Sequence, residues 1–167
     1  MSQNTSYSKN PAAGLPLRIK DLVGSGDKVM LVALPFLIVG LALNILFPAW
    51  FAVGGPSAAL KVISIIVLVP GVILWLWAVV LILVKVPRKQ LITSGPFAIM
   101  KHPIYSGVGL LVLPWFGFLL NTWLGALVGI ALYVGCRLYA REEEENLARV
   151  FGPAWETYRR KVLLPWL

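Results

Sequence analysis

The chain has 167 residues, of which 59% are apolar and only 13% are charged. A soluble domain is usually about half apolar and about a quarter charged, so this composition excludes an ordinary soluble domain. Three stretches lack Asp, Glu, Lys and Arg entirely, at residues 29–60, 62–84 and 103–136. Since about 20 apolar residues cross the hydrocarbon core of a bilayer, the sequence predicts an all-α, multi-pass membrane protein with about four spans.

The basic residues exceed the acidic ones and give a net charge of +8. Their distribution argues against a nucleic-acid partner, because 14 of the 15 flank the apolar stretches and only Lys61 lies elsewhere. Four spans with both termini and the loop 87–103 in the cytoplasm place those 14 on one side, as the positive-inside rule expects. We therefore expect anionic lipid head groups as partners and, from the compact chain, a prokaryotic inner membrane.

The first half of the chain is predicted to hold a polar N-terminal segment and two spans. Residues 1–28 form the expected cytoplasmic N-terminal segment, followed by spans at 29–47 and 60–86. Pro70 lies at the centre of the second span and should kink the helix, because proline has no amide hydrogen to donate.

The second half begins with two spans at 104–120 and 123–139, so that residues 29–139 form the predicted membrane domain. Only Asn121 and Thr122 separate these spans, which predicts a tight helical hairpin. Gly125 and Gly129 form a pattern of small residues that lets two helices approach closely.

Residues 140–167 are predicted to form a separate amphipathic segment. Apolar residues recur at helical spacing from Leu147 to Val162, which predicts one apolar helix face. The pair Gly152-Pro153 should divide the segment into two helices, since Gly often ends a helix and Pro often opens one. We expect the segment to lie on the cytoplasmic surface or to fold back over the central loop.

Candidates for chemistry are confined to residues 87–105 and 139–161, because the spans hold almost no ionisable groups. Backbone amides at the helix start that Pro103 predicts, beside His102 and Tyr105, are suited to hold a polar ligand at the membrane edge. A lone histidine before a helix is otherwise more often a cap or a surface residue. One His and one Cys cannot form a zinc site, so no metal is expected.

Two motifs together resemble a known family. The first runs from Gly95-Pro-Phe to Lys101-His-Pro-Ile-Tyr-Ser-Gly107, and the second combines Glu143-Glu144 with Leu147, Phe151-Gly152, Trp155, Tyr158 and Val162. In this order the motifs are similar to the integral-membrane methyltransferases that include isoprenylcysteine carboxyl methyltransferase and the phospholipid N-methyltransferases. The resemblance covers about residues 89–165.

The resemblance implies that S-adenosylmethionine binds under the loop and the C-terminal helices and that a lipidic acceptor enters from the bilayer. Residues 140–167 would then complete the cofactor site. Glu143 would be the family's cofactor-contacting carboxylate, and Glu144 a second candidate for a catalytic role. The cofactor-binding residues implied by position are Lys89, Gln90, Leu91, Ile92, Phe97, His102, Pro103, Ile104, Tyr105 and Glu143.

The chain departs from the family's pattern at several positions. Phe97 stands where the carboxyl methyltransferases usually have Tyr, Lys101 replaces the usual Arg, and the closing motif is different. Those enzymes also have an Arg four residues before the first glutamate, where this chain has Tyr139. Arg137 and Arg141 are the candidates to replace it, although two residues correspond to roughly 200° around a helix. Tyr139, Arg137 and Arg141 are therefore the predicted substrate-binding residues.

The expected chemistry is in-line methyl transfer, which needs alignment and exclusion of water more than acid–base groups. A carboxylate acceptor would need an Arg, whereas an amine acceptor must be neutral and would need a carboxylate or water to take its proton. The Tyr139 departure favours an amine or another non-carboxylate acceptor. Most of the run Glu142–Glu145 is otherwise explained as a solvated helix start, where acidic residues oppose the helix dipole.

Two other hypotheses remain open from the sequence. One is an NADPH-dependent membrane reductase of the sterol-reductase type, whose C-terminal region resembles this one. The other is a small, non-catalytic membrane scaffold. Calorimetry with S-adenosylmethionine and NADPH in parallel distinguishes all three.

Overall fold

A computed structural model describes residues 26–55 and 57–166. The described chain is all-α, and its only β contacts are two isolated bridges, Ala52 with Thr122 and Met100 with Leu164. This confirms the predicted fold class. The predicted N-terminal segment, except for its last three residues, lies outside the described residues.

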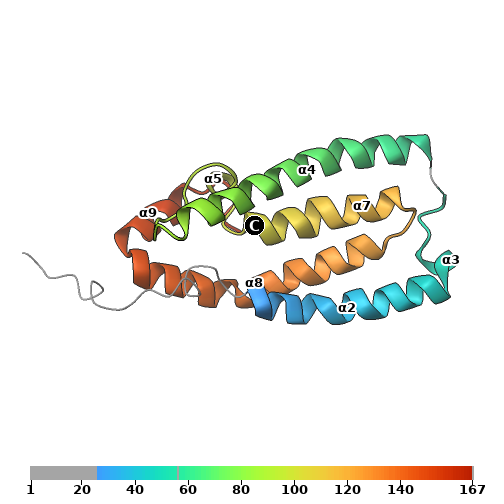
Figure 1. The fold of residues 1–167 in the computed structure, drawn as a ribbon, viewed down its shortest axis with the longest axis horizontal. Helices are drawn as coiled ribbons and strands as arrows, with labels where there is room; N and C mark the ends of the chain where they lie inside the picture. Colours follow the sequence, from blue (N-terminus) through green and yellow to red (C-terminus); the bar gives the residue numbers. More distant parts are fainter. Residues whose placement is uncertain (1–25, 56, 167) are drawn as a thin grey trace, which may run out of the picture.

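The helices follow one another along the chain with short connections (Figure 1). In order they are α2 (Gly26–Leu46), α3 (Pro48–Phe51), α4 (Ala58–Lys85), α5 (Pro96–Ile99), α6 (Pro103–Ser106), the π-helical η2 (Gly107–Val112), α7 (Leu113–Leu119), α8 (Leu124–Phe151) and α9 (Pro153–Lys161). Within the described residues, α2, α4 and α8 are long and apolar enough to cross a membrane. The third predicted span is the shorter apolar helix formed by α6, η2 and α7.

The four spans pack in the order α2, α8, α7, α4 (Figure 1). Each span contacts its neighbour in this order, and α2 and α4 occupy the two outer positions. The many exposed apolar side chains of α2 and α4 suit contact with lipid. One end of the row carries α3 and the turn between α7 and α8, and the other carries α5 and α9 (Figure 1).

The turn between α7 and α8 is the tight hairpin that the sequence predicts. Asn121 adopts a left-handed backbone conformation with φ of 58°. The hydroxyl of Thr122 accepts a hydrogen bond from the Leu124 amide at 3.1 Å and donates one to Asn44 of α2 at 2.9 Å. A side chain at Gly129 would collide with the backbone carbonyl oxygen of Gly109, so small residues are required where α8 crosses η2.

The structure differs from the sequence prediction at the end of the fourth span. Helix α8 continues past Tyr139 to Phe151, so the expected boundary at residue 140 falls inside one helix. At about 1.5 Å per residue, its 28 residues exceed a hydrocarbon core about 30 Å thick. The section 124–136 is uncharged, and Arg137 is the first charged residue of α8 after it. Gly152 then ends α8 and Pro153 begins α9, as predicted.

Two further features concern the course of the spans. Helix α4 includes Pro70 within one continuous helix, and the kink expected at Pro70 stays a prediction. The start of the third span widens into the π-helical segment η2, which the sequence did not indicate. Such segments are frequently found near functional sites, and η2 directly follows the His102-Pro103 helix start.

Candidate functional site

The loop between α4 and α6 folds back over the end of α4. The Gln90 amide donates to the Lys85 carbonyl at 3.2 Å, and Lys89 adopts a left-handed conformation with φ of 54°. Gly95 has a φ of 63°, and a Cβ there would lie 2.9 Å from the Trp77 ring of α4. Glycine therefore serves both the turn and the close approach to α4, and the loop is held against that helix.

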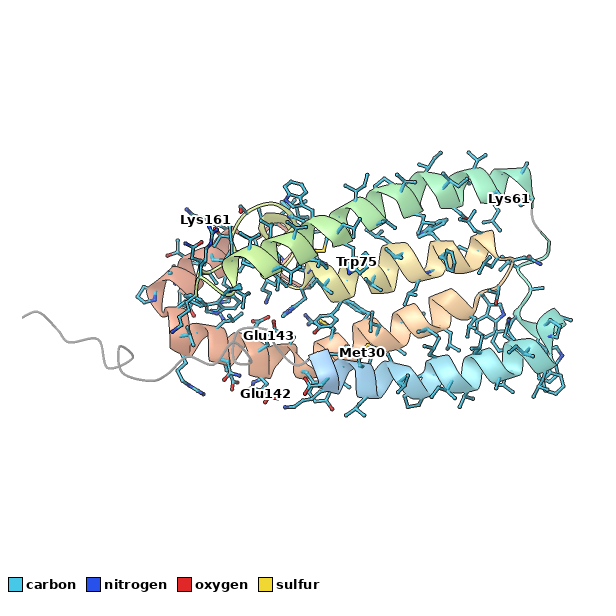
Figure 2. All side chains as sticks on the ribbon, in the orientation of Figure 1. Met30, Lys61, Trp75, Glu142, Glu143 and Lys161 are labelled. Carbon is cyan, nitrogen blue, oxygen red and sulfur yellow. The ribbon has the colours of Figure 1, made fainter. Side chains whose placement is uncertain are left out.

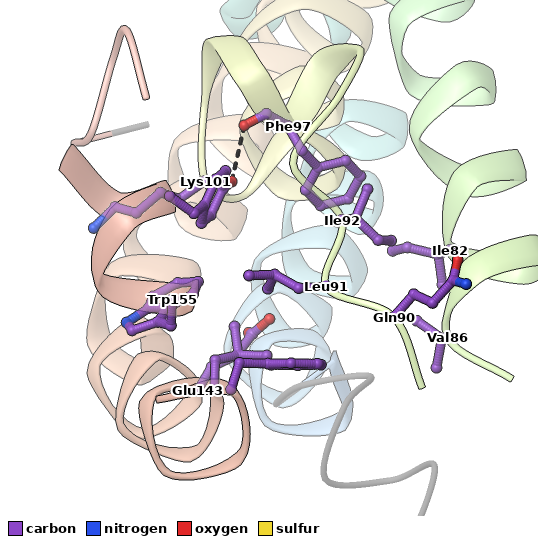
Figure 3. Close-up of a pocket in the computed structure, with 12 residues that line it drawn as sticks. Ile82, Val86, Gln90, Leu91, Ile92, Phe97, Lys101, Glu143 and Trp155 are labelled. Atoms are coloured by element: carbon purple, nitrogen blue, oxygen red, sulfur yellow. Dashed lines mark hydrogen bonds between the residues drawn. The ribbon is translucent and has the colours of Figure 1, made fainter. Parts of the chain in front are cut away.

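Helix α9 and the chain after it cover the outer side of this loop. The Tyr158 hydroxyl donates to the Phe97 carbonyl at 2.8 Å (Figure 3). The Leu164 amide donates to the Ile99 carbonyl at 2.7 Å. Burial raises the pKa of Tyr158, which keeps this hydroxyl protonated as a donor. Trp155, Tyr158 and Val162 form a buried cluster with Leu91 of the loop. The C-terminal segment therefore folds back over the loop, which is one of the two placements that we expected.

These elements enclose a cavity beside α4 and α8 (Figure 3). It has a volume of about 530 Å³, counting the part open to solvent. Its lining residues come from α4, the loop, α8 and α9: Ile82, Val86, Gln90, Leu91, Ile92, Phe97, Lys101, Glu143, Leu147, Phe151, Trp155 and Tyr158. An adjoining cavity shares Ile82, Phe97, Lys101 and Glu143 with the first and adds His102, Pro103, Ile104 and Tyr105. We call the two together the loop cavity.

The loop cavity brings together nine of the ten residues that the resemblance implied for cofactor binding. Gln90, Leu91, Ile92 and Phe97 line its first part, His102 to Tyr105 line the second, and Glu143 lines both. Lys89 does not line it, because the left-handed turn at this position leaves its side chain exposed. The assignment of these residues to a cofactor stays a prediction, since their proximity alone does not identify a ligand.

His102 occupies an interior position at the boundary between the loop and α8. Its side chain is only 5% exposed, so it is neither a surface residue nor a side-chain cap of α6. Its Nδ1 lies 3.9 Å from Oε2 of Glu143, and its Nε2 lies 3.6 Å from Oε1 of Glu144. The Nε2 atom is buried and has no hydrogen-bond partner within the described chain. The imidazole ring therefore lies between the two carboxylates, with its Nδ1 edge toward Glu143, which lines the loop cavity, and its Nε2 edge toward Glu144.

Tyr105 is more deeply packed than we expected. Its ring contacts the buried cluster of Val29, Ala33 and Leu132 between α2 and α8. Its hydroxyl lies where a side chain at Gly26 would approach to 3.0 Å, beside the start of α2. Tyr105 therefore connects the loop cavity to the membrane-spanning core.

Glu144 forms a half-buried ion pair with Lys101. The Lys101 side chain is 9% exposed and the Glu144 side chain is 21% exposed. Burial opposes ionisation of Glu144, but its contacts with His102 and Lys101 together outweigh this effect and lower its pKa to about 2. Glu144 is therefore charged at neutral pH and already neutralised by Lys101.

The predicted substrate residues lie on two different faces of α8. Arg137 and Arg141 line a groove with Lys101 and Glu144, outside the loop cavity. Tyr139 packs instead toward α2, where its ring lies 5.6 Å from the Lys28 ammonium. Residues four apart on a helix share a face, so Tyr139 lies one turn before Glu143 on the same face of α8. Arg137 and Arg141 lie on a different face. The structure does not bring these three residues together.

Sequence reasoning missed several residues that line the loop cavity. Lys101 was treated only as a departure from the family pattern, although it lines both parts of the cavity and pairs with Glu144. Its position directly before His102 was a usable signal. Trp155 and Tyr158 appeared only as motif residues, and the i, i+3 spacing that puts them on one helix face was the available signal.

A comparison with protein families identifies the family of the chain. The model of the isoprenylcysteine carboxyl methyltransferase (ICMT) family matches residues 59–149, which is more than half of the chain. The chain belongs to the ICMT family. The match contains both glutamates and the whole loop, and it ends before α9. Neither the curated proteins nor the solved structures gave a significant match.

ICMT-family proteins are S-adenosylmethionine-dependent methyltransferases of membrane acceptors, and this chain is therefore such an enzyme. This confirms the predicted activity, cofactor and lipidic acceptor class, and it favours methyl transfer over the reductase and scaffold hypotheses. The loop cavity fits the cofactor in its chemistry, because its described lining combines the carboxylate of Glu143 with several aromatic rings, among them those of Phe97 and Trp155. Carboxylates and aromatic faces both suit a sulfonium cation.

Proposed function

We propose that this ICMT-family enzyme methylates a lipid whose accepting atom is not a carboxylate, with the amine of a phospholipid head group as the best candidate. The observation that carries the proposal is the charge lining the loop cavity. Of the described residues that line it, none is an arginine, and its single lysine, Lys101, is paired with Glu144. A carboxylate acceptor would find no available guanidinium there.

The cofactor is proposed to bind in the loop cavity. When bound, S-adenosylmethionine supplies an electrophilic methyl group on a sulfonium with a good leaving group. Glu143 would stabilise positive charge on the cofactor, and His102 would contact it from the ring edge that carries Nδ1, which lies toward Glu143. The cover of α9 over the loop would exclude water, which strengthens electrostatic contacts and suppresses hydrolysis.

The acceptor is proposed to approach from the bilayer along the face of α8 that carries Tyr139 and Glu143. Tyr105 and Tyr139 both pack against the cluster between α2 and α8, one helical turn below the carboxylate of Glu143. An amine on this path must lose its proton before it attacks the methyl group. We assign this proton to Glu143, because its carboxylate lines both parts of the loop cavity, whereas Glu144 lines the groove beyond Lys101.

A second candidate is a prenylcysteine carboxylate, which the description of the matching family favours. This acceptor would require Arg137 or Arg141 to hold its carboxylate. Both arginines face the groove on the other side of Lys101, which argues against this role. The two candidates therefore differ in which face of α8 meets the substrate.

The orientation is proposed to place the loop cavity in the cytoplasm. Lys61 lies at the α3 end of the row, whereas Lys161, Glu142 and Glu143 lie at the opposite end (Figure 2). Cations retained on the cytoplasmic side would also contact anionic lipid head groups. The proposed orientation follows from the positive-inside rule, and the proposed lipid contacts follow from the charge on that side.

Purified protein supplied with methyl-labelled S-adenosylmethionine tests the acceptor. Phosphatidylethanolamine and a farnesylated cysteine analogue are offered separately, and calorimetry with S-adenosylmethionine and NADPH checks cofactor binding. We expect S-adenosylmethionine but not NADPH to bind, and label to appear in the phospholipid. Base-labile methyl ester on the cysteine analogue, with no label in lipid, would refute the proposed acceptor.

A further inference from the structure

The groove on the far side of Lys101 has no role in the chemistry described above. It is lined by Lys101, Arg137, Ala140, Arg141, Glu144, Pro165 and Trp166. Its floor is α8, and its wall is the chain that follows α9. Among the described residues, Lys101 alone lines both this groove and the loop cavity, so the two are neighbours but distinct. We call it the cationic groove.

The arrangement of charges on α8 explains why the groove is cationic. At about 100° per residue, Arg137, Arg141 and Glu144 fall within about 60° of one another on the helix, and Ala140 gives the groove room between them. The described lining thus contains three cations and one carboxylate, and that carboxylate is paired with Lys101. The other two cations of the described lining are the guanidinium groups of Arg137 and Arg141.

Both arginines are positioned with donors to spare. Arg137 donates through Nη1 to the Trp166 carbonyl at 3.1 Å, and Arg141 donates through Nε to Glu145 at 2.9 Å. The pair with Glu145 is well exposed and therefore weak. Since a guanidinium has five N–H donors, each arginine keeps several N–H groups for an oxyanion. Two guanidinium groups, each presenting a pair of parallel N–H donors, suit the oxygens of a phosphate.

The wall of the groove is held in place by hydrogen bonds to its backbone. The Trp166 carbonyl accepts from the Tyr133 hydroxyl at 3.2 Å as well as from Arg137. The side chains of Trp166 and Leu163 are 56% and 71% exposed, which suits insertion at the membrane–water interface. Arg137 is also the first charged residue after the uncharged section of α8, which places the groove at head-group depth.

We infer that the cationic groove is a binding site for the phosphodiester of an anionic phospholipid, held between Arg137 and Arg141 beneath Trp166. The inference rests on the proposed contact between this enzyme and anionic head groups, and it assigns that contact to one site. It does not depend on which lipid accepts the methyl group.

The test measures binding of short-chain phosphatidylglycerol to the full-length protein in detergent by native mass spectrometry. Arg141→Gln and the double variant Arg137→Gln/Arg141→Gln should weaken binding, at least about tenfold for the double change. Arg149→Gln/Arg159→Gln is the matched control, because it removes two exposed cations of α8 and α9 that lie outside the groove. An equal loss in the control would overturn the inference.

One further variant and two competing ligands separate the alternatives. Tyr133→Phe removes one hydrogen bond to the Trp166 carbonyl but no charge, so this variant should retain most of its affinity for phosphatidylglycerol. A tenfold loss of affinity in Tyr133→Phe would show that the wall of the groove, and not the two arginines, determines lipid binding. Displacement of the lipid by inorganic phosphate at similar concentration would assign the groove to free phosphate. Displacement by a farnesylcysteine carboxylate would assign it to an acceptor. Either result would overturn the inference.

Cofactor binding is measured on the same samples, so that failure of the proposed function is distinguishable. If wild-type protein binds phosphatidylglycerol through the two arginines but does not bind S-adenosylmethionine, the inference stands and the proposed cofactor site fails. If cofactor binds while the groove variants keep full lipid affinity, the inference fails and the cofactor site stands.

Discussion

Glu143 and Glu144 are consecutive on α8 but serve different cavities. Glu143 lines both parts of the loop cavity, whereas Glu144 lines the cationic groove and pairs with Lys101. The cause is helix geometry, because consecutive residues are about 100° apart around the axis. His102 lies between them, 3.9 Å from one carboxylate and 3.6 Å from the other.

Different consequences follow for Glu143→Gln and Glu144→Gln. Glu143→Gln should weaken S-adenosylmethionine binding, because its carboxylate lines both parts of the loop cavity. Glu144→Gln should lower thermal stability, because it leaves the nearly buried Lys101 ammonium unpaired, at a cost on the order of 1–3 kcal/mol. Calorimetry and melting in detergent measure the two effects, and an identical response of both variants would contradict the division of roles.

The stabilising effect of Glu144 should depend on pH. Its pKa in the folded protein is about 2, below the ordinary value of 4.5, so folding favours its charged form. The stabilisation is therefore fully present above about pH 4.5 and is lost as the pH falls through the folded pKa. We expect the difference in melting temperature between wild type and Glu144→Gln to be constant from about pH 5 to 7 and to shrink below about pH 4. A difference that grows on acidification would show the opposite linkage.

His102→Ala and Tyr105→Phe should both weaken cofactor binding. His102 and Tyr105 line the same part of the loop cavity, and the Nδ1 edge of His102 lies toward Glu143. The expected loss is on the order of 1–3 kcal/mol per hydrogen bond. Tyr133→Phe is the control for the second variant, since its hydroxyl bonds to Trp166 instead. Unchanged affinity in both site variants would remove these residues from the cofactor site.

The crossing of α8 and η2 predicts a graded response to added side chains. Gly129→Ala should destabilise the protein by about 1–3 kcal/mol, because its new methyl group meets the rigid backbone carbonyl of Gly109. Gly107→Ala is the matched control in the same region, where the nearest atom is the mobile Leu74 Cδ2 at 3.2 Å. Thermal or denaturant unfolding in detergent measures both. Equal stability of the two variants would contradict the close backbone approach of α8 and η2 at this crossing.

The membrane orientation is tested by cysteine labelling in sealed cells. In a background with Cys136→Ala, single cysteines at positions 5, 90 and 160 should resist a membrane-impermeant maleimide, because the cytoplasmic side holds most basic residues. Lys61→Cys, at the opposite end of the row, should be labelled. Labelling of positions 90 and 160 but not 61 would reverse the orientation.

The spans and the loop residues were predictable because they depend on local patterns. Charge-free stretches, Gly152-Pro153 and the His102-Pro103 pair each act over a few residues. The length of α8 was not predictable in the same way. The glutamates after Arg141 suggest a new polar segment, because the charge of the sequence changes there. Glutamate also favours helix, however, and in the structure these residues continue α8. The η2 segment and the pairing of Lys101 with Glu144 depend on contacts between distant elements, 43 residues apart in the second case, which no local pattern records.

The last prediction concerns Tyr139, which stands where the carboxyl methyltransferases have an arginine. In the structure this position shares the face of Glu143 and contacts the α2–α8 cluster, while Arg137 and Arg141 face the cationic groove. Neither arginine can therefore replace a guanidinium at position 139. We expect wild type to label phospholipid, and Tyr139→Arg to gain base-labile methyl ester formation on a farnesylated cysteine analogue.

The same assay contains its own control for the Tyr139→Arg variant. The new guanidinium would lie near the Lys28 ammonium, which now contacts the Tyr139 ring at 5.6 Å and the Glu142 carboxylate at 2.6 Å. Lys28→Gln/Tyr139→Arg removes this repulsion and should show the larger gain, whereas Lys28→Gln alone should show none. Robust ester formation by wild type would show that Tyr139 does not exclude a carboxylate. The acceptor would then be held by groups other than an arginine at this position.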